Sequence, residues 1–203
     1  MGFFTTFVPL KLTEMELLKQ RILQDGKSLS ENVLKVDNFI NHQLDAQLLM
    51  CIGVEFARRF AYERATKILT IEASGIAPAV MTGYCMGIPA IFAKKAKPGT
   101  MTESYCSNVH SFTKNTDYQI VVGKEFIKPG DRILIIDDFL AYGSAANSLI
   151  EIVEQAGAKV VGMGFLIEKA FQGGGKMLKE RGFHVESLAR IEELKEGVVK
   201  FCD

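Results

Sequence analysis

From Lys67 onward, short apolar segments alternate with helix-forming segments, and this alternation restricts the fold more than any other feature of the chain. The apolar segments have the length and composition of buried strands: Lys67–Ile71, Ala90–Ala93, Arg132–Ile136, Lys159–Ile167 and Val185–Ile191. Helix-forming stretches lie between them, at residues 77–86, 144–156 and 176–181. A glycine follows each stretch, as is common after the last turn of a helix. Strands that alternate with helices predict an α/β fold with a central, mostly parallel sheet flanked by helices.

Other parts of the chain depart from this alternation. Polar, alternating segments at Tyr105–Thr113 and Tyr118–Val122 predict an exposed antiparallel pair of strands. Nearer the N-terminus, apolar residues at helical spacing predict one helix that ends before Gly26 and another that begins after Asp45. These elements precede the first predicted strand of the sheet.

Composition limits the class of protein. A chain of 203 residues with 48% hydrophobic residues fits one globular domain, which we expect over residues 15–203, with residues 1–14 as an N-terminal extension of unknown role. Lys plus Arg equals Asp plus Glu, 24 each, so no overall charge favours nucleic acid or an anionic membrane. No apolar run approaches the roughly 18 residues of a membrane helix, and the N-terminus lacks a signal-peptide pattern. We therefore expect a cytoplasmic protein.

The segment Ile133–Ala145 has the strongest chemical signal. A buried strand ends in Asp137 and Asp138, and a short loop leads into a helix. Ligands of open α/β sheets bind at the carboxyl ends of strands, and a helix N-terminus beside Gly143 offers N–H groups to a phosphate. Two adjacent carboxylates repel one another, which favours a compensating ligand such as sugar hydroxyls or Mg²⁺. The segment has neither a GxGxxG nor a Walker A pattern, and no Cys or His spacing suggests a metal site of the protein itself.

This strand, acidic pair and small loop resemble the phosphoribosyl diphosphate (PRPP) signature of type I phosphoribosyltransferases. Several further segments resemble the xanthine phosphoribosyltransferase branch of that family: residues 34–43, 71–78, 111–114, 168–171 and 186–190. The similarity extends from about Met15 to Phe201. It implies the type I phosphoribosyltransferase fold, with a small hood formed by about residues 27–44 and the C-terminal part, and a flexible antiparallel flap at residues 100–118. It also implies a homodimer.

The resemblance assigns roles residue by residue. Asp137 and Asp138 would be catalytic: they would bind the ribose hydroxyls, directly or through the Mg²⁺ that PRPP carries, and stabilise the positive charge that develops on the ribose. PRPP would be bound by the loop residues Ala141, Tyr142, Gly143, Ser144 and Ala145, by Ser74 and Gly75, and by Lys94. Xanthine would be bound by Leu34, Asn41 and Lys169. Phe139 and Phe171 could stack on the base.

Several of these assignments have plainer alternatives. By composition alone, Asn41 would be an ordinary loop asparagine and Leu34 a core leucine, and the loop at Ser74 and Gly75 would be an ordinary strand-to-helix turn. Phe139 and Phe171 could simply be core residues. Lys169 could donate to the 6-oxo group of a purine, which a 6-amino group would refuse, or it could be a surface lysine paired with Glu168. Lys94, with Lys95 and Lys97, could balance the charge of pyrophosphate or simply form a solvated loop.

Ala141 stands where some 6-oxopurine transferases place a carboxylate that acts as a general base. Xanthine is more acidic than guanine or hypoxanthine, so it could attack as an anion without that base. We predict an enzyme of purine salvage that transfers 5-phosphoribosyl from PRPP to N9 of xanthine, forming xanthosine 5′-monophosphate and diphosphate. A guanine- or hypoxanthine-preferring transferase is one alternative, because those bases share the 6-oxo group. A non-catalytic PRPP-sensing regulator is another, although about thirty residues before the core leave little room for a DNA-binding domain.

Overall fold

The computed structural model describes residues 14–96, 99, 103–111 and 116–202. A six-stranded sheet with the order β10-β9-β8-β7-β3-β4 forms its centre. Its strands are β3 (Lys67–Ile71), β4 (Ala90–Ala93), β7 (Arg132–Leu140), β8 (Lys159–Lys169), β9 (Val185–Lys195) and β10 (Val198–Phe201). Neighbouring strands are parallel except β9 and β10, which are antiparallel. The predicted mostly parallel sheet is confirmed, and β10 is an addition to it.

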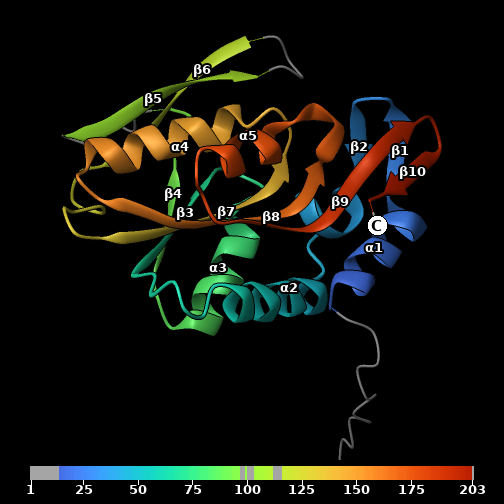
Figure 1. Cartoon of the computed structure of the whole chain (residues 1–203), viewed down its shortest axis with the longest axis horizontal. Coiled ribbons are helices and arrows are strands. Elements are labelled where there is room, and N and C mark those ends of the chain that lie inside the picture. The colour runs from blue at the N-terminus through green and yellow to red at the C-terminus, as the bar shows by residue number, and fades with distance from the viewer. Residues whose placement is uncertain (1–13, 97–98, 100–102, 112–115, 203) are drawn as a thin grey trace, which may run out of the picture.

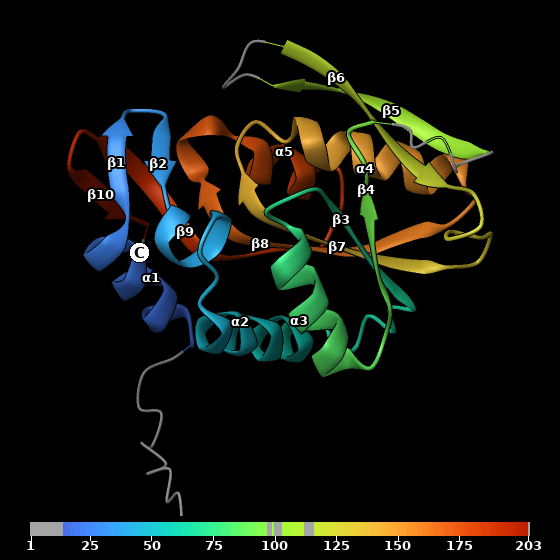
Figure 2. The ribbon, with the colours of Figure 1, turned by 180° about the vertical axis from the view of Figure 1, so that it is seen from behind.

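Helices cover both faces of this sheet (Figures 1 and 2). On one face lie α2 (Ala46–Arg59) and α3 (Ile76–Met86), and on the other lie α4 (Ser144–Gln155) and α5 (Gly174–Glu180). The central strand β7 is buried on both sides: Leu134 and Ile136 pack into the core on the α2 and α3 face, and Ile133 and Ile135 into the core on the α4 face. This burial explains why the strand reads as a continuous apolar run.

An antiparallel hairpin of β5 (Ser104–Ser111) and β6 (Thr116–Gly123) lies over α4 (Figure 1). The predicted pair of polar strands is therefore confirmed. Residues 100–102 and 112–115 of the expected flap lie outside the described residues.

The N-terminal elements gather at the β9–β10 end of the sheet (Figures 1 and 2). They are α1 (Glu14–Asp25), the short strands β1 (Lys27–Ser30) and β2 (Val33–Lys35), and a π-helix at Asp37–Asn41. Helix α1 already begins at Glu14, which we expected to end the extension, and residues 1–13 lie outside the described residues. The N–H of Gly197 donates to the carbonyl of Ser28 at 3.0 Å, so the expected hood contacts the C-terminal strands.

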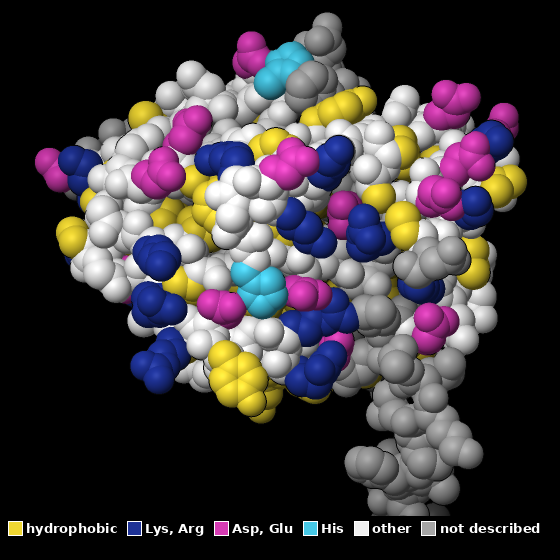
Figure 3. All heavy atoms as spheres, in the orientation of Figure 1, with side chains coloured by type: hydrophobic (Ala, Val, Ile, Leu, Met, Phe, Trp, Pro, Cys, Tyr) yellow, Lys and Arg dark blue, Asp and Glu magenta, His cyan; other side chains and the backbone are white. Residues whose placement is uncertain are grey.

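Acidic and basic side chains are interspersed on the face shown in Figure 3. Within the described residues, no helix is long and apolar enough to cross a membrane.

Candidate active site

A cavity of about 600 Å³ opens at the carboxyl ends of β3 and β7. Segments that are distant in the sequence meet in its wall: the turn between β1 and β2, the loop after β3, the end of β7 with the following loop, and the β5–β6 hairpin. The lining residues include Asn32, Glu72, Ser74, Gly75, Lys95, Tyr118, Asp137, Asp138, Phe139, residues 141–146 and Gln172. The cavity lies where open α/β sheets bind ligands.

Asp137 and Asp138 lie at the centre of this wall, in the last residues of β7. The side chain of Asp137 is buried, and its Oδ1 accepts a hydrogen bond from the N–H of Asp138 at 3.1 Å. Burial raises the pKa of Asp137 well above its ordinary value, and the charge of Asp138 raises it further. Burial also raises the pKa of Asp138. The pair therefore favours a ligand that offers hydroxyl donors or a cation.

The same pair fits the Mg²⁺ that the resemblance implies. Mg²⁺ prefers oxygen ligands and is commonly held by one or two carboxylates together with substrate phosphates. The two neighbouring carboxylates supply such oxygens, and because their like charges repel one another, a cation between them would be stabilising. Among the described residues no group of three or more His, Cys, Asp or Glu side chains could hold a metal ion, so the substrate would have to complete the coordination.

The predicted phosphate loop lies against the cavity over its whole length, since all of residues 141–145 line it. Gly143 precedes α4 with φ of +88°, a left-handed conformation that glycine adopts without a Cβ clash. Helix α4 then begins at Ser144, so its first N–H groups and the positive end of its dipole are at the cavity. Tyr142 lines the cavity and is 44% exposed.

The loop after β3 forms the opposite wall. Glu72, Ser74 and Gly75 line the cavity, and the peptide bond between Glu72 and Ala73 is cis. Gly75 packs against the acidic pair: a Cβ at this position would lie 2.4 Å from Oδ1 of Asp137 and 2.1 Å from Oγ1 of Thr70. We expected glycine here because backbone approaches a phosphate; the structure shows that close packing against Asp137 also requires it.

The two adjacent lysines after β4, Lys94 and Lys95, have different surroundings. The backbone of Lys94 pairs with Val121 in both directions, at 2.9 and 2.8 Å, and Lys94 is not among the lining residues of the cavity. Lys95 does line the cavity, its Nζ lies 5.3 Å from the centre of the Tyr118 ring, and its N–H donates to Glu72 at 2.5 Å. The charge of Lys95 also opposes the rise in pKa of both aspartates. Lys97 lies outside the described residues.

Lys169 lies at the end of β8, near the hood. It is only 8% exposed, its Nζ donates to the carbonyl of Asn32 at 2.6 Å, and it lies 5.4 Å from the centre of the Phe139 ring. Burial lowers the pKa of Lys169, and the charge of Asp138 opposes that shift. The surface-lysine alternative does not describe this residue, because Glu168 pairs with Arg190 at 3.1 Å instead.

The hood residues that line the cavity are not the predicted xanthine ligands. Leu34 is buried in the core and Asn41 is exposed at the end of the π-helix, and neither lines the cavity. Asn32 and Val33 line it in their place, together with Gln172 from the short 3₁₀ helix at Ala170–Gln172. Phe139 lines the cavity, whereas Phe171 does not. The only sequence signal for Asn32 was its place in a polar turn, and nothing in the sequence paired it with Gln172.

Comparison with solved structures supports this fold. An adenine phosphoribosyltransferase from Rhodothermus marinus aligns with a TM-score of 0.69 and 24% identity, covering 88% of this chain and 99% of that chain. An adenine phosphoribosyltransferase from Giardia lamblia, solved with 9-deazaadenine, aligns with a TM-score of 0.70 and 17% identity, covering 85% and 97%. At these identities the likeness shows the type I phosphoribosyltransferase fold alone.

Curated proteins give a closer match, although no family model matches the chain. The chain is 53% identical over 193 residues to the xanthine phosphoribosyltransferase of Moorella thermoacetica, covering 95% of this chain and 98% of that protein. It is 56% identical over 188 residues to that of Bacillus cytotoxicus, covering 92% and 95%. It is 53% identical over 190 residues to that of Pseudomonas entomophila, covering 93% and 100%. With this identity over nearly the whole of both chains, the protein belongs to the xanthine phosphoribosyltransferase family.

Proposed function

We propose that this protein transfers the 5-phosphoribosyl group from PRPP to N9 of xanthine, releasing diphosphate and forming xanthosine 5′-monophosphate. The observation that carries the proposal is the acidic pair of buried Asp137 and half-buried Asp138, set between two backbone loops suited to anions, with Lys169 beyond it at the hood. One cavity thus offers loops suited to a phosphate and a diphosphate and carboxylates suited to a ribose; Lys169 is not among its lining residues but contacts Asn32, which is. The family membership supports the same reaction.

The chain's residues divide the work along this cavity. Residues 141–145 and the N-terminus of α4 would hold the 5′-phosphate, and the loop Glu72–Gly75 with Lys95 would hold the diphosphate. Asp137 and Asp138 would bind the ribose hydroxyls and stabilise the positive charge that grows on the ribose as the C1–oxygen bond breaks. Mg²⁺, bound through the diphosphate and the acidic pair, would neutralise charge on the leaving group.

At the base end, Lys169 would donate to the 6-oxo group. The side chain of Ala141 offers no group that could take a proton, so the base would have to attack already deprotonated, which suits xanthine. We expect Ala141→Asp to change the rate with xanthine little, because an anionic base needs no proton acceptor. A large gain with xanthine would contradict this part of the mechanism.

A product assay tests the proposal. The purified protein is incubated with PRPP and Mg²⁺ and with xanthine, guanine, hypoxanthine or adenine, and the nucleotides are separated by chromatography. We expect xanthosine monophosphate to form fastest. Faster turnover of guanine or hypoxanthine would assign the enzyme to those bases, and PRPP binding without any product would indicate a regulator.

We also propose that the protein is a cytoplasmic homodimer, as the resemblance implies. Exposed apolar side chains on the adjacent helices α2 and α3 support the dimer: Met50, Val54, Val80 and Tyr84. Contiguous exposed apolar surface commonly marks an interface. Light scattering after gel filtration should give twice the 22.5 kDa chain mass. Val54→Glu with Tyr84→Glu should yield monomers, whereas Phe126→Glu, at an exposed position in the turn after β6, should not. A monomeric unaltered protein would contradict the proposal.

A further inference from the structure

Gln172 joins the hood to the C-terminal half of the sheet at the wall of the cavity. Its Nε2 donates to Oδ1 of Asn32 at 2.9 Å, and both residues line the cavity. The backbone carbonyl of Asn32 accepts from Nζ of Lys169 at 2.6 Å. Asn32 is therefore bound by two side chains that are three residues apart in the sequence: Lys169 contacts its backbone carbonyl, and Gln172 contacts its side chain.

The other polar atom of this amide is unusual. Oε1 of Gln172 is buried and has no hydrogen-bond partner among the described residues. Leaving a buried acceptor unpaired costs free energy, and folded proteins pair nearly all such atoms. An unpaired acceptor on a side chain that lines a ligand cavity indicates that its donor comes with the ligand.

The purine proposed above carries a suitable donor. In a 6-oxopurine the acceptor oxygen at C6 is adjacent to a ring N–H donor at N1, whereas adenine has the reverse order, an amino donor followed by a ring acceptor. Lys169 has donors only, and Oε1 of Gln172 is an acceptor only. Both side chains contact Asn32, and as a donor and an acceptor they would match a 6-oxopurine and mismatch adenine at both positions.

We infer that Gln172 is a further specificity-determining residue, which accepts the N1–H of the base while Lys169 donates to its 6-oxo group. This inference rests on the proposed function. Because Oε1 is enclosed in the structure, the amide turns toward the cavity when the base enters, and the contact with Asn32 is the one it gives up. Asn32 is then a positioning residue for the empty site, because its side chain holds the amide at the cavity wall until the base enters.

Kinetics of Gln172→Leu test this role, because leucine has a similar volume but no acceptor. We expect kcat/KM for xanthine and hypoxanthine to fall about tenfold to a hundredfold, since an N–H that is buried without its partner disfavours binding. The rate with adenine should hold or rise, and KM for PRPP should stay within about twofold. A merely structural role would lower the rates with all bases together and would leave the preference for 6-oxopurines over adenine unchanged.

The matched control is Asn32→Ala, which removes the side chain bound by Gln172 but leaves the backbone carbonyl that Lys169 contacts. It should keep the preference for 6-oxopurines over adenine, because the acceptor of Gln172 is still present. Melting temperatures identify any variant that fails to fold, and Gln172→Met replaces Gln172→Leu in that case. If the unaltered protein converts no base, the proposed function fails. If it converts 6-oxopurines and the Gln172 variants keep its selectivity, only this inference fails.

Discussion

At the scale of single residues, the acidic pair acts against the stability of the fold. Asp137 is 4% exposed and adjoins a second carboxylate, so its charged form is disfavoured by burial and by repulsion. Gly75 is confined by the same carboxylate, since any side chain there would collide with Oδ1 of Asp137. Residues suited to catalysis commonly lower stability in this way, because the ligand supplies the missing interactions.

Replacing Asp137 should therefore raise the stability of the fold and lower the activity. A raised pKa means that the folded protein binds a proton more readily than the unfolded chain, so the ionised carboxyl destabilises the fold as the pH rises above its ordinary pKa of 3.8. Asp137→Asn should raise the melting temperature at pH 7 by about 2–4 °C for each kcal/mol of relief. Its kcat should fall about a hundredfold or more.

Calorimetry at pH 7 and at pH 4 checks this prediction. The gain in melting temperature should shrink at pH 4, where the carboxyl of the unaltered protein takes up its proton. Glu196→Gln, in the exposed turn between β9 and β10, is the control and should change neither the melting temperature nor kcat. A lower melting temperature for Asp137→Asn at pH 7 would show that the ionised carboxylate stabilises the fold.

At the scale of elements, α4 connects the phosphate loop to the hairpin that borders the cavity. Side chains one turn apart on its outer face bind β5: Ser148 Oγ donates to the carbonyl of Asn108 at 2.7 Å, and Ser107 Oγ donates to Glu151 at 2.6 Å. Gln155 pairs with both backbone groups of Cys106, at 2.8 and 3.3 Å. The base of the hairpin is thus fixed to the helix whose first turn faces the cavity.

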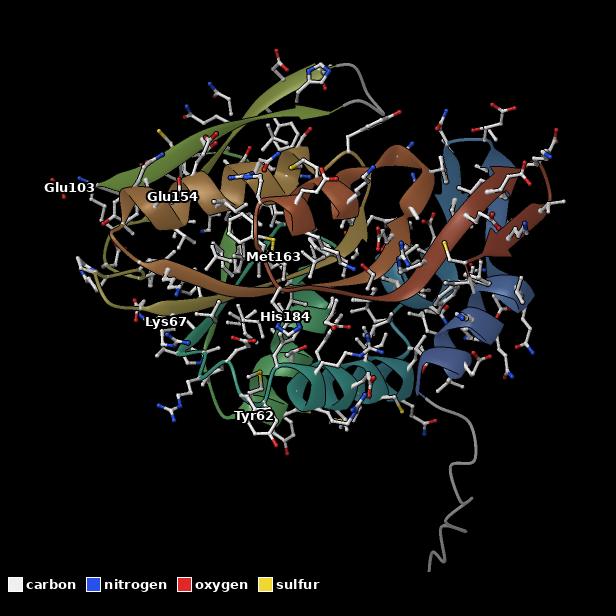
Figure 4. All side chains as sticks on the ribbon, in the orientation of Figure 1. Tyr62, Lys67, Glu103, Glu154, Met163 and His184 are labelled. Atoms are coloured by element: carbon white, nitrogen blue, oxygen red, sulfur yellow. The ribbon has the colours of Figure 1, made fainter. Side chains whose placement is uncertain are left out.

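Removing the amide of Gln155 should loosen the hairpin without changing the residues of the cavity. Each lost hydrogen bond costs about 1 kcal/mol, so amide hydrogen exchange in β5 should quicken about tenfold in Gln155→Ala. A looser cover admits water, so hydrolysis of PRPP should rise relative to transfer. Glu154→Ala is the control, because Glu154, labelled in Figure 4, takes no part in these hydrogen bonds. Unchanged exchange in Gln155→Ala would contradict the role of α4.

At the scale of the whole molecule, carboxyl groups at the two ends of β3 and β7 have pKa values shifted in opposite directions: raised for Asp137 at the carboxyl ends and lowered for Asp131 at the amino ends. At the amino ends, Asp131 accepts from Nζ of Lys67 at 2.6 Å and from the N–H of Lys128 at 2.8 Å; Lys67 is labelled in Figure 4. Burial alone would raise the pKa of Asp131, but these hydrogen bonds and the charge of Lys67 lower it below its ordinary value of 3.8. The end of these strands away from the cavity is thus the one where the carboxylate is paired with a cation.

Asp131→Asn should therefore destabilise the protein in a way that depends on pH. A depressed pKa contributes stability above the ordinary value of 3.8, and this contribution is lost as the pH falls through the lowered pKa. At pH 7 the loss should be about 1 kcal/mol, or about 2–4 °C in melting temperature, with the transfer rate unchanged. The difference between Asp131→Asn and the unaltered protein should narrow below pH 3.8. A difference that is the same at pH 7 and pH 3 would contradict the assigned charge effect.

The sequence alone determined the elements whose signals are local. Strands buried on both faces read as apolar runs, so β3 could be predicted at its observed bounds and β7 and β8 from their first residues. The structure extends β7 to Leu140 and β8 to Lys169. The acidic pair and the phosphate loop are contiguous in the chain and adjoin a strand end, so their presence at one site followed from the topology of parallel sheets. The short strands β1 and β2, the π-helix and β10 were not predicted, because tertiary packing rather than a strong local pattern supports them.

Only the tertiary structure decided which residues from distant parts of the chain line the cavity together. Asn32 and Gln172 are 140 positions apart, and their contact depends on how the hood packs on the C-terminal strands. Backbone pairing beside β4 and in β6 distinguishes the two lysines: the backbone of Lys94 pairs with Val121, and it is Lys95 that lines the cavity. In the hood, Leu34 lies in the core and Asn41 at the surface, and neither lines the cavity; their contact with xanthine stays a prediction. Side-chain direction in a loop is set by contacts distant in sequence, and no local pattern records them.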